Sequence, residues 1–133
     1  MKINYFVLPI LLFLFCFLGS IYLSTIPAKD LTTLNWLKIP YLDKIIHIGI
    51  FFTLCFTFSF ALNPLYSKKI SAPILIAIVL LFVSYGTGVE FYQENYVEGR
   101  SFEIADIAAD AFGCLLFVAW YKYGSILKKS WSR

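Results

Sequence analysis

The sequence contains little charge. Only 14% of its 133 residues are Asp, Glu, Lys or Arg, whereas 60% are hydrophobic. An average soluble domain has about a quarter charged residues, and a domain of this length must cover a large surface with polar groups. Eleven basic and eight acidic side chains are too few for that task. A soluble enzyme, a disordered tail and a nucleic-acid-binding module fit this composition poorly. Lipid is the expected solvent, and we expect no nucleic acid partner.

The sequence also lacks the short motifs of common catalytic and metal sites. It has no Ser-His-Asp grouping, no phosphate-loop glycine pattern and no H-E-x-x-H zinc motif. Cys16, Cys55 and Cys114 lie in separate apolar stretches without the spacing of metal ligands. We therefore expect buried thiols and not a disulfide framework. We expect no cofactor, and the sequence leaves a metal ion undecided.

Four long apolar stretches are the main pattern in the sequence. They run over about 5–26, 45–62, 72–92 and 103–123. Each is near the ~20 residues that a helix needs to cross a hydrocarbon core of about 30 Å. Backbone groups in lipid must be satisfied internally, so each stretch is expected to be helical despite its many Phe, Ile and Val residues. The sequence predicts an all-α fold: one domain over residues 1–133, built as a four-helix transmembrane bundle.

Two segments leave alternatives open. The first stretch follows Lys2, as in a signal peptide. It is too long for a typical signal core and no A-x-A-like site follows it, which favours a retained membrane helix. The segment 28–42 is compatible with a short helix in the membrane interface, with Trp36 and Tyr41 at headgroup level. An irregular, aromatic-rich loop is an equal alternative.

Lys and Arg residues are divided unequally between the two sides of the predicted bundle. With four spans, both termini and the 63–71 loop share one side. That side contains seven basic residues and no acid: Lys2, Lys68, Lys69, Lys122, Lys128, Lys129 and Arg133. The other side and the adjoining helix ends contain four basic residues and all eight acids. Because an excess of Lys and Arg marks the cytoplasmic side, both termini are predicted to be cytoplasmic.

Polar residues within the spans are concentrated at their outer ends. They recur at spacings of three or four residues, which places them on one face of each helix. Gly86 and Gly88 predict close packing of the third helix. Charges inside spans are costly and usually face a bundle interior or a watery cavity. We therefore predict an outward-facing polar pocket built from Asp43, His47, Glu90, Gln93, Arg100, Asp106 and Asp110.

Several kinds of chemistry suit these residues. His47 with Asp43 resembles a general base and its orienting acid. Arg100 and Lys44 are suited to phosphate or carboxylate, and several oxygen ligands with one imidazole suit a divalent cation. The candidate catalytic residues are His47, Glu90 and Asp106. The candidate ligand-binding residues are Asp43, Lys44, Gln93, Arg100 and Asp110.

A structural role is the alternative for most of these residues. Asp43 is placed to be the N-cap of the second helix, and His47 to hydrogen-bond Asp43 and nothing else. Glu103 has the position of a solvated acid in the first turn of a helix. Arg100 would then act as a fork that bridges two carboxylates and clamps the bundle.

The same residues resemble those of a known family. Asp43-Lys44-x-x-His47 resembles the first signature of VanZ-like membrane proteins. Glu90-x-x-Gln93, Arg100-Ser101 and Asp106-x-x-x-Asp110-x-x-Gly113 resemble the second. The resemblance covers roughly residues 41–117 and extends to chain length and number of spans. It departs at Asp110, where the family commonly has Asn, and at His47-Ile-Gly-Ile-Phe51, where an aromatic run with Tyr is common.

This resemblance implies a multi-pass protein of the bacterial inner membrane with a role in the cell envelope. The namesake of the family is linked to resistance to glycopeptide antibiotics such as teicoplanin, and the family has no settled reaction. We expect the pocket to bind a lipid-linked or cell-wall-related anionic ligand, with membrane lipid as a partner. One alternative is a non-enzymatic accessory subunit whose polar cluster only locks the helices. Ion or proton movement is less favoured, since the inner halves of the spans lack matching charges.

Overall fold

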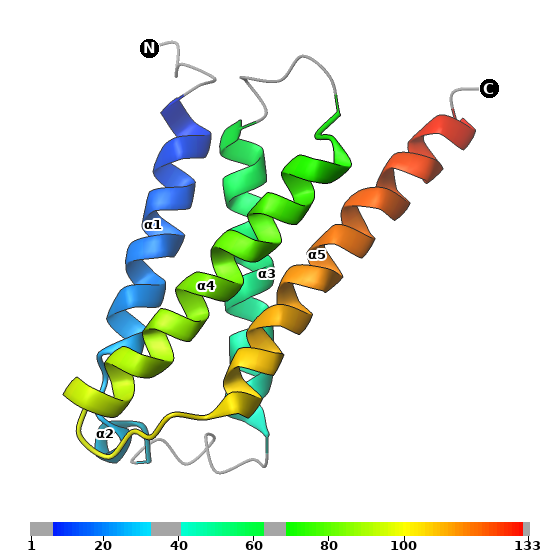
Figure 1. The fold of residues 1–133 in the computed structure, drawn as a ribbon. Helices are drawn as coiled ribbons and strands as arrows, with labels where there is room; N and C mark the ends of the chain where they lie inside the picture. Colours follow the sequence, from blue (N-terminus) through cyan, green and yellow to red (C-terminus); the bar gives the residue numbers. More distant parts are fainter. Residues whose placement is uncertain (1–6, 33–40, 63–68, 132–133) are drawn as a thin grey trace.

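The structure of the chain, a computed structural model, describes residues 7–32, 41–62 and 69–131, with side chains over 7–30, 41–62 and 69–124. Its elements are α1 (Val7–Ser24), α2 (Ala28–Thr32), α3 (Leu42–Leu62), α4 (Ala72–Tyr96) and α5 (Ile104–Trp131). The four long helices run alternately up and down, so that α1 begins and α5 ends at the same end of the bundle (Figure 1). No strand occurs within these described ranges. The all-α prediction is confirmed.

The four long helices are long and apolar enough to cross a membrane. Their spanning parts are Val7–Ser24, Leu42–Leu62, Ala72–Tyr96 and Ile104–Gly124. The helix α4 continues to Tyr96, one turn beyond the predicted end, and α3 begins at Leu42, directly after Tyr41 with its positive φ of 62°. Of the predicted interface segment 28–42, residues 28–32 form the short helix α2. Trp36 lies outside the described residues.

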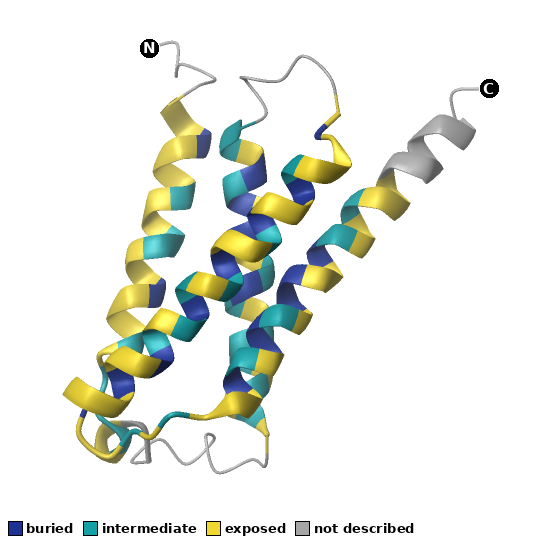
Figure 2. Cartoon of the chain, in the orientation of Figure 1, coloured by how far each residue is buried: buried dark blue, intermediate teal, exposed yellow. Residues whose placement is uncertain are grey.

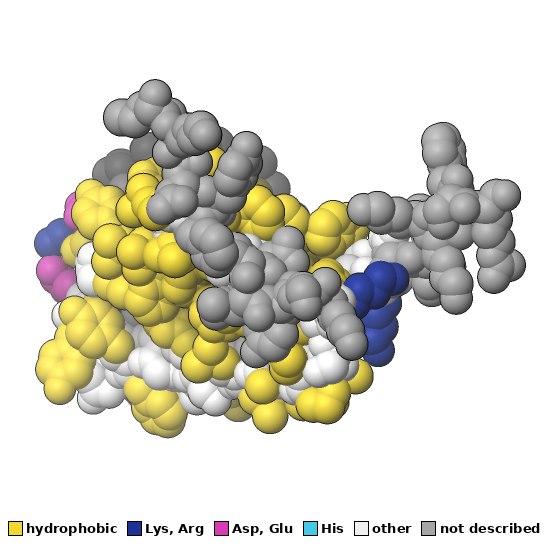
Figure 3. All heavy atoms as spheres, turned by 90° about the horizontal axis from the view of Figure 1, so that it is seen from above, with side chains coloured by type: hydrophobic (Ala, Val, Ile, Leu, Met, Phe, Trp, Pro, Cys, Tyr) yellow, Lys and Arg dark blue, Asp and Glu magenta, His cyan; other side chains and the backbone are white. Residues whose placement is uncertain are grey.

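The surface of the bundle is apolar. Only Pro9 and Ser20 of α1 are buried, whereas Phe15 is 77% exposed and Leu18 62%. Figure 2 shows such exposed residues along the outer faces of all four long helices. In the end-on view of Figure 3, hydrophobic side chains cover most of the visible described surface and charged ones lie only at its edges. An apolar belt of this extent faces lipid and not water. The chain is thus a multi-pass membrane protein.

The core is built from aromatic and small side chains. The rings of Phe13, Phe58 and Phe82 join α1, α3 and α4, with centroids 5.1 Å apart for Phe13–Phe58 and 5.5 Å apart for Phe58–Phe82. Cys55 on α3 and Cys114 on α5 are fully buried and free, as expected of apolar thiols, whereas Cys16 on α1 is free but only partly buried. In lipid, such close packing replaces the hydrophobic effect as the force between helices.

Two glycines allow neighbouring helices to come close. A Cβ on Gly113 of α5 would collide with the backbone carbonyl of Ile48 on α3. One on Gly86 of α4 would collide with the carboxylate of Asp110 and lie 2.9 Å from Phe51. The prediction of close packing is therefore confirmed for Gly86. It is wrong for Gly88, where an added Cβ would meet nothing within 4 Å.

The contact at Gly113 predicts the effect of a methyl group. Gly113→Ala is expected to destabilise the bundle by about 1–3 kcal/mol, since overpacking forces a backbone shift and Ile48 offers a backbone atom that cannot rotate away. The matched control is Gly88→Ala, in which the same methyl group enters open space. The measurement is thermal unfolding in detergent. Equal melting temperatures for the two variants would contradict the close approach of α3 and α5.

Candidate functional site

The polar residues of the spans converge at the end of the bundle that carries α2 and the 97–103 connection (Figure 1). Lys44, in the first turn of α3, is directed toward α5. Its Nζ atom lies 2.9 Å from Asp43 Oδ2 and 2.5 Å from Glu103 Oε2, and it pairs with Asp106 Oδ1. The Lys44 side chain is only 20% exposed. One ammonium group thus compensates three carboxylates.

His47 lies one turn further along α3. Its Nδ1 atom is 2.8 Å from Asp110 Oδ1, and Asp110 is buried, with 1% of its surface exposed. Its Nε2 atom is 3.8 Å from Asp106 Oδ2. The predicted orienting acid was Asp43, on the same helix. The structure instead supplies this acid from α5, because the Asp43 carboxylate pairs with Lys44.

Glu90 lies on α4 and is fully buried, with 0% exposure. Its Oε2 atom accepts a hydrogen bond of 3.0 Å from the backbone N–H of Glu103, immediately before α5 begins. A carboxylate at this position satisfies a free N–H group and interacts favourably with the helix dipole. The Oε1 atom of Glu90 is buried and has no hydrogen-bond partner.

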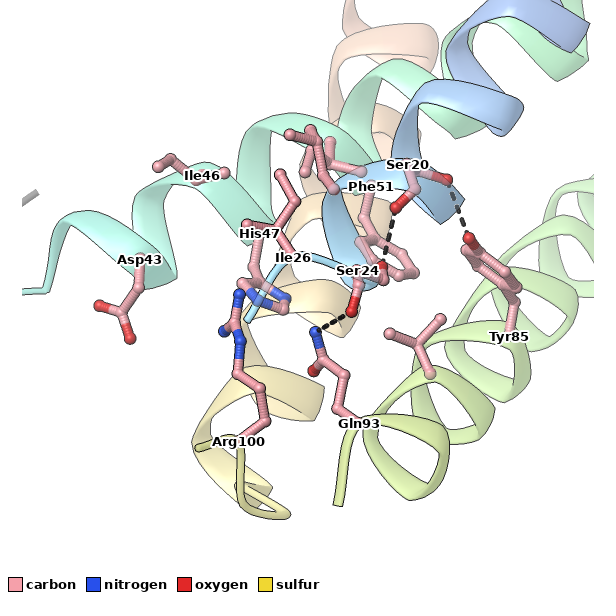
Figure 4. Close-up of a pocket in the computed structure, with 13 residues that line it drawn as sticks. Ser20, Ser24, Ile26, Asp43, Ile46, His47, Phe51, Tyr85, Gln93 and Arg100 are labelled. Carbon is pink, nitrogen blue, oxygen red and sulfur yellow. Dashed lines mark hydrogen bonds between the residues drawn. The ribbon is translucent and has the colours of Figure 1, made fainter. Parts of the chain in front are cut away.

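Arg100 occupies the connection between α4 and α5. Gly99, with a positive φ of 76°, turns the chain there, and the backbone N–H of Arg100 donates to the carbonyl of Val97 at 3.2 Å. Figure 4 shows its guanidinium group beside the ring of His47. The Nε atom is buried without a hydrogen-bond partner, and Arg100 forms no ion pair with the described carboxylates. The structural alternative, an Arg100 clamp between carboxylates, is wrong, and Lys44 takes that role.

The end of α1 contributes polar groups that sequence reasoning missed. Gln93 Nε2 donates to the carbonyl oxygen of Ser24 at 3.1 Å, and Ser20 Oγ lies 2.8 Å from the hydroxyl of Tyr85 (Figure 4). Ser20 and Ser24 are four residues apart on an otherwise apolar helix, so they share a face. This spacing of Ser20 and Ser24 was the sequence feature that could have predicted a contribution of α1 to the site. No comparable sequence feature predicts that Tyr85 pairs with Ser20.

The predicted pocket divides into a cavity and a buried cluster beside it. The cavity has a volume of about 300 Å³. Its polar lining residues are Ser20, Ser24, Asp43, His47, Tyr85, Gln93 and Arg100, and its apolar ones are Leu23, Ile26, Ile46, Ile50, Phe51 and Val89. Glu90, Asp106 and Asp110 are buried and do not line it. His47 belongs to both sets.

The structural alternatives for Asp43 and Glu103 have different outcomes. The helix α3 begins at Leu42, so Asp43 lies in its first turn and not at the N-cap, and it pairs with Lys44 on the same helix. Glu103 is a half-exposed acid at the start of α5, as its alternative describes, with 49% of its side chain accessible. It also pairs with Lys44 and donates its N–H to Glu90, so it joins α3, α4 and α5.

A second hollow, a groove between α1 and α3, adjoins the cavity. It has a volume of about 370 Å³ and shares four lining residues with the cavity: Ser20, Leu23, Ile46 and Ile50. On α3 it extends from Ile46 to Leu54, which is about 12 Å at ~1.5 Å per residue. Gly19 and Gly49 line it, and a Cβ at either would meet nothing within 4 Å. The groove is apolar and reaches from the polar end toward the middle of the bundle.

Comparisons of the chain with models of protein families, with curated proteins and with solved structures find no match.

The position of Lys44 predicts a large loss of stability on its removal. Lys44→Met is expected to cost on the order of 3 kcal/mol, because it leaves the buried carboxylate of Asp106, and two half-exposed ones, without a cation. The expected loss of unfolding free energy is moderate because Glu103 is partly exposed. The measurement is thermal unfolding in detergent.

The control for this prediction is Lys29→Met. Lys29 pairs with Glu98 at 2.9 Å, with side chains 64% and 75% exposed. Such a surface pair contributes about 0–1 kcal/mol. If Lys44→Met melts no earlier than Lys29→Met, the carboxylates around Lys44 do not depend on it.

Proposed function

We propose that the cavity binds the anionic headgroup of a lipid-linked or cell-wall-related ligand, and that the chain is a VanZ-like protein of the bacterial inner membrane. The observation that carries this proposal is Arg100. The residue lines the cavity, and its Nε atom is buried without a hydrogen-bond partner. A buried donor on a charged group is costly unless a partner satisfies it. A phosphate or carboxylate is the partner that matches a guanidinium group in charge and geometry.

The other cavity residues suit the same ligand. Gln93 and Ser24 supply amide and hydroxyl groups, and Tyr85 adds a phenol. The carboxylate of Asp43 is engaged by Lys44, which reduces its repulsion of an anion. The rest of the lining is aliphatic or aromatic. A cavity of this composition favours an amphiphile over a small inorganic ion.

The groove between α1 and α3 supports a lipid-linked ligand. It adjoins the cavity, with which it shares four lining residues, and extends about 12 Å toward the bundle centre at ~1.5 Å per residue. A headgroup at Arg100 would leave its hydrocarbon chain at the mouth of this groove. The open positions at Gly19 and Gly49 leave room for it.

The family proposal rests on which residues meet. The two VanZ-like signatures are separated by some forty residues in the sequence, yet Lys44 of the first pairs with Asp106 of the second, and His47 with Asp110. Arg100 and Gln93, from the second, line one cavity with Asp43 and His47. A fold that gathers both signatures at one end supports a shared ligand site.

A second candidate function is that of an accessory subunit whose polar cluster only locks the helices. Lys44, His47 and Glu90 favour it, since each has a partner on α5 or at its start. The two candidates differ at the cavity. Locking requires neither Arg100, which pairs with no described carboxylate, nor an open groove.

The orientation in the membrane gives one prediction. We infer that the cavity end faces outward and both termini face the cytoplasm, from the Lys and Arg distribution. Glu98→Cys, at the cavity end, should react with a membrane-impermeant maleimide in cells whose outer membrane has been removed and whose inner membrane is intact. Lys122→Cys, near the other end, should react only after permeabilisation. The reverse pattern would refute this orientation.

The ligand proposal predicts selective binding of an anionic amphiphile. In neutral detergent, the wild-type protein should bind lysophosphatidylglycerol at least ten times more tightly than zwitterionic lysophosphatidylcholine. Arg100→Gln should abolish this preference, because it removes the charge while retaining length and polarity. Lys122→Gln, which removes an exposed cation far from the cavity, should not. Calorimetry or native mass spectrometry measures both affinities.

Two glycine variants distinguish binding of the ligand's headgroup from binding of its hydrocarbon chain. Gly49→Leu fills the groove, so it should weaken lysophosphatidylglycerol binding at least tenfold and leave binding of inorganic phosphate unchanged. Gly88→Leu places the same side chain in open space outside the groove and should have no effect on either. Loss with Arg100→Gln but not with Gly49→Leu would mean a free anion as ligand. If folded Arg100→Gln binds lysophosphatidylglycerol as the wild type does, the ligand proposal is refuted and the accessory role is the function that remains.

A further inference from the structure

The buried cluster beside the cavity contains a set of metal-ligating atoms. One ring nitrogen of His47 and one carboxylate oxygen each of Glu90 and Asp106 lie within 4.8 Å of one another. Glu90 is 0% exposed and Asp106 6%. Three ligands around one zinc ion at 2.0–2.2 Å are about 3.4 Å apart in tetrahedral geometry. Small side-chain movements therefore suffice to bring the three atoms onto one ion.

The hydrogen bond of His47 leaves the correct nitrogen available. Nδ1 is engaged by Asp110 at 2.8 Å, so Nε2 is the free atom, 3.8 Å from Asp106 Oδ2. Histidines that bind metals almost always direct their second nitrogen to a carboxylate or carbonyl, which fixes the tautomer and raises the basicity of the ligand. Asp110, itself 1% exposed, has this position.

Glu90 supplies an independent observation. Its Oε2 atom accepts the N–H of Glu103, whereas Oε1 is buried and has no hydrogen-bond partner. A buried carboxylate oxygen without a donor is costly. No described side chain provides that donor. A cation bound between His47, Glu90 and Asp106 would compensate the charge of this carboxylate.

The charge balance of the cluster favours a dication. Five carboxylates gather here, and Lys44 is the one cation that pairs with any of them among the described Lys and Arg residues at this site. The five are Asp43, Glu90, Glu103, Asp106 and Asp110. Three of the five, Glu90, Asp106 and Asp110, are buried. Even with Lys44 and a protonated His47, these three keep excess negative charge in a region of low dielectric, where uncompensated charge is strongly unfavourable. A divalent ion removes most of this excess.

We propose that His47 Nε2, Glu90 and Asp106 bind a divalent transition-metal ion of the zinc class, with Asp110 positioning the imidazole. The nitrogen ligand and the small number of oxygens disfavour Ca²⁺ and Mg²⁺, which take six or more oxygen ligands including water. Three protein ligands leave a coordination position open. Because His47 also lines the cavity next to Arg100, that position adjoins the proposed anion site. The metal site does not depend on the ligand proposal.

The test is zinc binding by the full chain, purified in detergent with a tag that contains no histidine. Wild-type protein should retain about one zinc ion per chain after dialysis against micromolar Zn²⁺ and gel filtration, by mass spectrometry of the metal. Glu90→Gln should weaken binding more than tenfold. Asp110→Asn should weaken it 10- to 100-fold through the orientation of His47. The control is Glu94→Gln, which removes an exposed acid one turn away on α4 and should bind like wild type.

The single histidine of the chain makes a second measurement decisive. Zinc-edge X-ray absorption of the wild-type protein should show the outer-shell scattering of one imidazole, which only His47 can supply. This readout holds even if Glu90→Gln fails to fold. Less than a tenth of an equivalent of zinc on the wild type, bound zinc without imidazole, or equal affinities of folded Glu90→Gln and Glu94→Gln would each overturn the site.

Discussion

The ammonium group of Lys44 is the contact on which the polar end of this protein depends. It lies among carboxylates of α3 and α5 and pairs with Asp43, Glu103 and Asp106. Without a cation at this point, these acids would repel each other, most strongly at the buried Asp106, where water screens little. The ends of α3 and α5 would then separate. The bond from His47 to Asp110, one turn deeper, requires that they stay together.

Close packing in the apolar part and charge pairing at the polar end support each other. The backbone of α3 at Ile48 lies against Gly113 of α5, which sets both the distance between the helices and their rotation. That rotation decides which acid meets His47. The carboxylate of Asp110 also lies against Gly86 of α4, so a third helix restricts it. Side chains held from several directions keep their positions, which is a requirement for a ligand site.

The spans, the all-α fold and the convergence of polar residues at one end were predictable, because length, hydropathy and spacing within a helix are local properties. The partners were not, because they depend on relations between helices. Asp43 shares a face with His47 in the sequence, but Asp110 is nearer in space since α5 packs on α3. For Arg100 the sequence left both ligand binding and a clamp between acids open, and the structure places it at the cavity, after the turn at Gly99. Ser20 meets Tyr85 across sixty-five positions of sequence.

The buried polar atoms without hydrogen-bond partners distinguish a ligand-binding site from a polar cluster that only holds the helices together. Pairing a guanidinium with a carboxylate is the most effective way to satisfy both in a protein interior. A cluster with the sole task of holding helices together would join Arg100 to Glu90, which have opposite charges and each keep a buried polar atom without a hydrogen-bond partner. Here the two do not pair: Arg100 lines the cavity and Glu90 belongs to the buried cluster, with His47 common to both. The two proposals therefore assign them different ligands: an anion on the cavity side and a cation on the buried side.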